Sequence, residues 1–150
     1  MLGLFSKKPP SLDRFPTEKW TVAQCVSDGG PMILRVNSGA RKFVAHPELP
    51  IRLGVTVSFN QPNEHGFCTS DEGAQLGVIE DRLCEGLLAA RTAFPVLVIT
   101  VGGRREFVFF TRDKSAASPI VDEVAASTST HKLTYGFLDD SEWTCYTQLR

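Results

Sequence analysis

The stretch PVLVITVGGRREFVFFT, residues 95–111, consists of two largely apolar runs separated by a pair of glycines. Pro95–Val101 is apolar apart from Thr100, which is typical of a buried strand. Gly102 and Gly103 accept the positive φ angles of a tight turn, and Arg105–Thr111 then returns as a second strand. We therefore expect an antiparallel hairpin at the centre of the fold.

A strand and a helix are predicted before this hairpin. Ile51–Phe59 alternates apolar and polar side chains, as a half-buried strand does. Thr69 and Glu72 form the T-x-x-E pattern of a capping box, in which each side chain accepts a hydrogen bond from a free backbone amide at the helix start. The apolar residues that follow recur at helical spacing and form the stripe Leu76, Ile79, Leu83 and Leu87.

A second helix and a last strand are predicted after the hairpin. Ser118 and Pro119 are residue types of an N-cap and a first helical position, so we expect the helix to begin there. Lys132–Leu138 reads as the closing strand. Because crossovers of this kind share one hand, both helices should cover one face of the sheet. The order predicts an α+β protein, a ferredoxin-like βαββαβ sandwich.

The residues before this unit add a further element. Trp20–Val26 and Pro31–Asn37 have strand patterns and are separated by the turn residues Asp28, Gly29 and Gly30, which predicts an added N-terminal β-hairpin. Residues 1–16 show no sustained periodicity, so we expect a flexible leader arm there and a single α+β domain over residues 17–150.

The strand Arg105–Thr111 carries apolar side chains on both faces. Phe107 and Phe109 share one face, whereas Val108 and Phe110 share the other. The face opposite the helices should therefore also be covered. The N-terminal hairpin, Trp143 or a partner chain could provide the cover.

Composition excludes several classes of protein. The formal net charge of the 150 residues is −1, so there is no surplus of Lys and Arg of the kind that broad nucleic-acid binding requires. None of the four cysteines forms a C-x-x-C pair, which argues against a zinc knuckle or a redox motif and favours a reducing cytoplasm. No segment is long and apolar enough to cross a bilayer. We expect no cofactor and no metal.

The first group of candidate binding residues lies on the predicted first helix. Glu72 and Glu80 are two turns apart and could share a face, where paired carboxylates bind metals or act as acid and base. Asp81 points about 100° away from Glu80. No histidine sits at the spacing of di-iron helices, so a solvated helix face with a carboxylate paired to an arginine is the simpler interpretation.

The second group lies around the central hairpin and at the C-terminus. Arg104 and Arg105 follow the two glycines and could contact an anion or RNA, although the simpler interpretation is an arginine paired with the helix carboxylates. Trp143 and Tyr146 could form an aromatic ligand platform, or could pack the C-terminal segment onto the sheet. The seven candidates are thus Glu72, Glu80, Asp81, Arg104, Arg105, Trp143 and Tyr146.

The order and spacing of a set of residues resemble a bacterial family known as domain of unknown function 695. The set spans nearly the whole chain after the leader: Trp20, Asp28, Gly29, Arg35, Val55–Phe59, Gly66, Glu72, Leu76, Ile79–Leu83, Gly103–Phe107, Asp140, Trp143 and Tyr146. The family is distantly similar to the ribonuclease E inhibitors called RraB, which are ferredoxin-like and act by binding the nuclease. The resemblance implies a cytoplasmic regulator and supplies no catalytic residue. The resemblance also predicts a tyrosine at the end of the second hairpin strand, where this chain has Phe110.

These observations favour a non-enzymatic protein-interaction or regulatory module with a protein partner. The chain has no P-loop and no nucleophile elbow. One alternative is a small enzyme or ligand-binding domain that uses Glu72, Glu80, Arg105 and Tyr146 around a pocket. Another is RNA binding by an open sheet face. The identity of the partner and homo-oligomer formation stay open.

Overall fold

The computed structural model describes residues 8–149 and contains one six-stranded sheet with helices packed on it. The first seven residues of the leader and Arg150 lie outside the described part. In chain order the elements are η2 (Leu12–Arg14), β1 (Trp20–Ser27), β2 (Gly30–Asn37), η3 (Ser38–Phe43), β3 (Ile51–Ser58), α1 (Ser70–Ala89), β4 (Ala93–Val101), β5 (Arg104–Thr111), α2 (Lys114–Ser127), β6 (Leu133–Asp139) and α3 (Thr144–Leu149).

The sheet confirms the predicted α+β class. Its strand order is β1-β2-β4-β5-β3-β6, and every neighbouring pair is antiparallel. The four strands β4, β5, β3 and β6 are arranged in a manner consistent with the ferredoxin-like topology. The hairpin β1–β2 joins this unit at the β4 edge, where β2 pairs with β4. The edge strands of this sheet are therefore β1 and β6.

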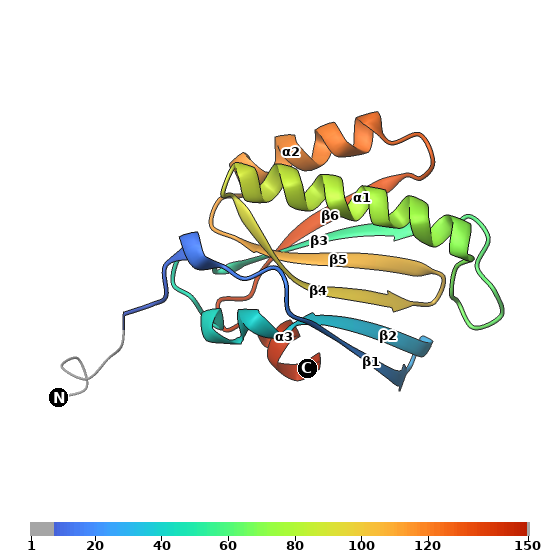
Figure 1. Cartoon of the computed structure of the whole chain (residues 1–150), viewed down its shortest axis with the longest axis horizontal. Helices are drawn as coiled ribbons and strands as arrows, with labels where there is room; N and C mark the ends of the chain where they lie inside the picture. The colour runs from blue at the N-terminus through green and yellow to red at the C-terminus, as the bar shows by residue number, and fades with distance from the viewer. Residues whose placement is uncertain (1–7, 150) are drawn as a thin grey trace.

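Helices α1 and α2 lie side by side on one face of the sheet (Figure 1). The core beneath them combines the predicted α1 stripe with strand residues such as Val55, Val98 and Phe107. Val55, Phe107 and Val98 are opposite one another in the β3–β5–β4 register, so their side chains point to the same face. The buried residues of α1 recur with the helical period of 3.6 and those of β3 with a period of 2, as the sequence pattern predicted.

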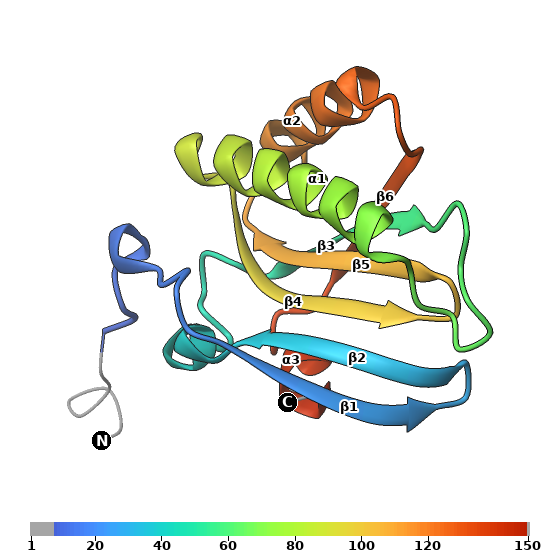
Figure 2. The same ribbon diagram turned by 45° about the vertical axis from the view of Figure 1, so that its right-hand side comes forward.

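The opposite face of the sheet is also covered. The cover consists of the short helix η3 and the C-terminal segment with α3. Phe110 and Val108 pack there with Phe43 of η3, and with Trp143 and Tyr146 at the C-terminus. Trp143 is thus one of the covering groups that the sequence suggested. The N-terminal hairpin does not cover this face, because it extends the sheet in its own plane (Figure 2).

The described part of the leader is attached to this second core. The ring of Phe15 lies 4.8 Å from that of Phe43 and 5.0 Å from that of Phe94, measured between centroids. His46 Nε2 lies 2.9 Å from the carbonyl oxygen of Pro10. Residues 10–15 therefore pack against the domain, whereas the flexible arm was expected to extend to residue 16.

Two predicted helix starts differ from the structure. Helix α2 begins at Lys114, with Asp113 as N-cap accepting hydrogen bonds from the amides of Ser115 and Ala116. The predicted start at Ser118 and Pro119 is therefore wrong, and Pro119 lies inside the helix. The Asp113 cap and the complete burial of Ala117 favour the additional turn, even though Pro119 then lies inside the helix and has no amide to donate.

The first turn of α1 keeps only half of the predicted capping box. The amide of Glu72 donates to Thr69 Oγ1 at 3.2 Å, as expected. The Glu72 carboxylate instead accepts hydrogen bonds from the amides of Asn60 and Gln61, in the loop after β3. The side chain thus ties the loop to the helix rather than closing its own cap. Within residues 8–149, no helix has the length and apolarity needed to cross a membrane.

Candidate functional site

Glu72 lies in a buried network between α1, the loop after β3 and the segment before β6. Its carboxylate accepts a hydrogen bond from the Asn60 amide at 2.5 Å and from the Gln61 amide at 3.3 Å. His131 Nε2 lies 2.6 Å from Oε2 and donates to it, because an ionised carboxylate only accepts. Burial alone would raise the pKa of Glu72, but the hydrogen bonds outweigh this effect and hold the pKa below 4.5.

Glu80 lies on the side of α1 that faces β2, and Asp81 points to solvent. Glu80 forms an ion pair with Arg35 of β2, and the Arg35 guanidinium lies over the Trp20 ring, 5.5 Å from its centroid. An ion pair between a helix carboxylate and an arginine was the simpler of the two interpretations, and the structure contains it. The pair attaches the N-terminal hairpin to the helix layer.

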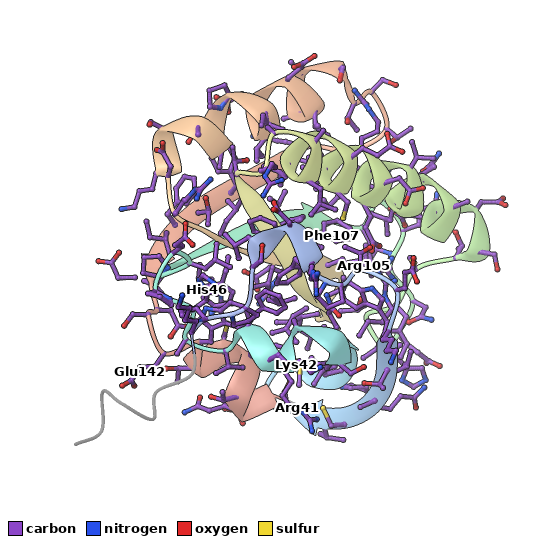
Figure 3. The ribbon with its side chains drawn as sticks, turned by 60° about the vertical axis from the view of Figure 1, so that its left-hand side comes forward. Arg41, Lys42, His46, Arg105, Phe107 and Glu142 are labelled. Atoms are coloured by element: carbon purple, nitrogen blue, oxygen red, sulfur yellow. The ribbon has the colours of Figure 1, made fainter. Side chains whose placement is uncertain are left out.

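Arg105 points to the helix-covered face of the sheet, whereas Arg104 is exposed at the β4–β5 turn. Figure 3 shows Arg105 and Phe107 on the side of the sheet beneath α1. Arg105 Nε donates to Thr100 Oγ1 at 2.9 Å, and the guanidinium lies 5.7 Å from the centroid of the Phe59 ring. Burial lowers the pKa of Arg105. The expected ion pair between Arg105 and an α1 carboxylate does not form; Arg35 takes that place.

Trp143 and Tyr146 are completely buried in the second core. The Trp143 ring stacks on Phe110 at 4.3 Å between centroids and 9° between planes, and its Nε1 donates to the Leu49 carbonyl at 3.0 Å. The hydroxyl of Tyr146 donates to the Asn37 carbonyl at 2.8 Å. These contacts are those of packing residues, so the two rings do not form an exposed platform.

The structure does not bring the candidate residues together. Glu72, Glu80 and Arg105 lie on the helix side, whereas Tyr146 lies on the opposite side of the sheet. The pocket that the enzyme alternative required from these four side chains does not form. The strand aromatics Phe107, Phe109 and Phe110 are at most 1% exposed, so β5 offers RNA no open stacking surface.

A different feature was missed by the sequence analysis: the free edge of β1. Burial is low along the whole strand, and all six residues between Trp20 and Ser27 are exposed. Val22 is 66% exposed and Val26 is 84% exposed. No other strand within residues 8–149 pairs with this edge (Figure 2). Large exposed apolar side chains on an unpaired strand are a recognised template for strand addition.

The register determines which backbone groups point outward. Val26 is opposite Pro31 in β2. Proline has no amide, so this pair cannot exchange both backbone hydrogen bonds and is a non-hydrogen-bonded pair of the β1–β2 ladder. Because the two kinds of pair alternate, the amides and carbonyls of Val22, Gln24 and Val26 point to the free edge.

One sequence signal could have identified this edge. β1 has the sequence WTVAQCVS, which contains no charged residue and no proline. Natural edge strands usually carry a lysine, a proline or a bulge that discourages pairing with other chains. The opposite edge strand, β6, ends in Asp139 and contains Gly136. Among the residues described, no three His, Cys, Asp or Glu side chains are placed to hold a metal ion.

Comparison with known proteins identifies the family. The fold and the exposed edge define an α+β domain with an unpaired, uncharged strand at one side of its sheet. A family model described as a family of unknown function (DUF695) matches residues 18–149, and the chain belongs to this family. Searches of curated proteins and of solved structures find no match to the chain.

Proposed function

We propose that the chain is a non-enzymatic, cytoplasmic protein-interaction module that binds a protein partner along the free edge of β1. The observation that carries the proposal is the eight-residue uncharged strand whose outer edge has no partner within residues 8–149. A partner strand placed there would satisfy the outward backbone groups of Val22, Gln24 and Val26 with a regular ladder.

The exposed side chains of β1 support the same function. Val22 and Val26 stand on the helix-side face of the strand, each two residues from Gln24. Covering both valines with a partner strand would remove apolar surface from water, and each fully buried valine contributes about 1.5–3 kcal/mol. Hydrogen bonds between the two backbones would provide the affinity. Val22 and Val26 would provide specificity, because they favour a partner strand with apolar residues opposite them.

The resemblance to ribonuclease E inhibitors names the partner to be tested first. Those inhibitors are regulators that bind the nuclease, so we propose a regulatory role in which this chain binds a nuclease or another enzyme through β1. A measured effect of the purified protein on cleavage by ribonuclease E, with Val22→Lys/Val26→Lys as the inactive comparison, tests this finer assignment.

A quantitative affinity capture tests the general proposal. The wild-type protein, the double variant Val22→Lys/Val26→Lys and the control Leu138→Lys are each immobilised, and recovered proteins are compared by mass spectrometry. Leu138 is a suitable control because it is 61% exposed on the opposite edge strand. We expect the same partner with wild type and control, and a loss of about tenfold or more with the double variant.

Two outcomes would count against the proposal. One is a partner recovered equally by the wild type and the double variant, which would place binding on another surface. The other is the absence of any protein above background in repeated captures. Circular dichroism of each variant separates a lost interaction from a lost fold. The competing enzyme and RNA hypotheses have less support, because their residues are dispersed or buried.

A further inference from the structure

A hollow of the surface lies near each end of β1. At its start lies a hollow of about 630 Å³ between residues 14–19 and residues 38–43. At the hairpin end lies a smaller hollow of about 240 Å³. The smaller hollow is lined by Gln24, Cys25, Val26, Pro31, Met32 and Phe67. A strand added antiparallel to β1 would end near the larger hollow, beside the residue that precedes β1.

The larger hollow is strongly basic. Its lining includes Arg14, Lys19, Arg41 and Lys42 and a single carboxylate, that of Glu18. Figure 3 shows Arg41 and Lys42 on η3, and a hydrogen bond from the Ser38 amide to the Lys19 carbonyl joins η3 to the residue before β1. The positive charges therefore gather near the first residue of β1.

None of these four cations has a carboxylate partner within residues 8–149, in contrast to four arginines elsewhere in the described chain. Arg35, Arg52, Arg91 and Arg112 each form an ion pair with a carboxylate. Within residues 8–149, Arg14, Lys19, Arg41 and Lys42 form none. In a protein with a formal net charge of −1, this is a local concentration of unpaired positive charge. It is complementary to an acidic ligand.

We propose that the partner of β1 is an extended peptide segment whose alternating apolar residues are followed, toward its C-terminus, by acidic residues. This inference rests on the proposed function and specifies the chemistry of the partner. Every pair in the sheet is antiparallel, and a peptide that continues this pattern runs from the Val26 end toward Trp20. Its apolar side chains cover Val22 and Val26, and its acidic end enters the basic hollow.

A second copy of the chain fits the edge less well. If two β1 strands paired about a two-fold axis, the turn of one copy would approach the basic hollow of the other. The β1–β2 turn supplies only the acidic residue Asp28. Most of the positive charge would then stay unpaired, whereas a peptide with several acidic residues neutralises it.

Fluorescence anisotropy with synthetic peptides tests the proposal on the full-length protein. The probe peptide alternates threonine and valine and ends in aspartate and glutamate residues; its comparison peptide ends in lysines. We expect the acidic peptide to bind about tenfold more tightly in dilute buffer, with the difference much reduced at about 0.5 M salt. Arg41→Glu/Lys42→Glu should remove this preference. The matched control Lys114→Glu/Lys132→Glu changes exposed lysines away from β1 by the same charge.

N-methylated peptides test strand addition without changing the protein. Methyl groups on one set of alternate amides block the ladder with β1, whereas methyl groups on the other set point away from it. We expect the peptide whose methyl groups point away from β1 to bind, and the peptide whose methyl groups face β1 to lose binding.

Three results would overturn the inference. Equal binding of the acidic and lysine peptides, still sensitive to one methylation pattern, would reject the acidic partner and leave β1 as a binding edge. Binding that is insensitive to methylation would reject strand addition itself. A doubled mass in light scattering, lost in Val22→Lys/Val26→Lys and without peptide binding, would assign the edge to a second copy.

Discussion

Replacing Glu72 with glutamine tests whether its buried network holds the α1 layer to the β3 loop and β6. The carboxylate is 6% exposed and accepts three hydrogen bonds, from the amides of Asn60 and Gln61 and from His131 Nε2. A glutamine keeps the shape but presents one acceptor oxygen and an NH₂ group to three donors. Leaving a buried donor without its acceptor costs about 1–3 kcal/mol, and more where the lost acceptor was charged.

That cost is large relative to the stability of a domain of this size, which is typically about 5–15 kcal/mol. Urea unfolding followed by circular dichroism measures the change in the free energy of unfolding. Glu85→Gln, an exposed site on the same helix, should change it by about 0.5 kcal/mol or less. A loss below about 1 kcal/mol in Glu72→Gln would refute the assigned role of the network.

The pH dependence of stability provides a second measurement on the same variant. The folded-state pKa of Glu72 lies below the unfolded-state value of about 4.5. Its stabilising contribution is therefore present above pH 4.5 and is lost as the pH falls through the lower folded-state value. The wild type should lose stability over this acid range more steeply than Glu72→Gln, which has no carboxyl at this position. Equal slopes would contradict the assigned ionisation.

Two further predictions concern the second core and the thiols. Trp143→Ala should destabilise the fold by about 3–5 kcal/mol in urea unfolding, because Trp143 is fully buried and stacks on Phe110; a change near zero would contradict this packing role. In the native protein near pH 8, Cys25 should react quickly with a thiol reagent because it is exposed. Cys84 and Cys145 should react only after unfolding, since burial raises the pKa of each to about 12.

The pattern of apolar residues was sufficient to predict the sheet and the helix layer. The alternation in Ile51–Phe59 and the stripe that includes Leu76 and Leu83 correspond to β3 and to the buried face of α1. These elements bury one face each, so local periodicity records their environment directly. Thr69 is the N-cap of α1, as its spacing to Glu72 indicated.

Contacts between residues distant in sequence could not be predicted in this way. Glu72 pairs with His131 and Tyr146 donates to the Asn37 carbonyl, across separations of 59 and 109 residues. No local periodicity encodes such pairs. The start of α2 was missed because Ser118 and Pro119 have strong helix-start propensities, whereas the burial of the preceding turn is a tertiary effect.

The candidate site was predicted least well. Motif-based reasoning selects residues with chemical groups, and it therefore selected residues that stabilise the scaffold, such as Arg105 and Trp143. The β1 edge has no such group in its sequence. Its importance depends on which strand ends the sheet, and this is a property of the topology.

Amide hydrogen exchange at β1, measured by NMR, tests the central claim most directly. In the free protein, the amides of Val22, Gln24 and Val26 should exchange rapidly because they point to an unpaired edge. Adding the acidic peptide should slow these three amides and leave those of β6 unchanged. Protection of the three amides in the free monomer, or no change on peptide addition, would contradict the account.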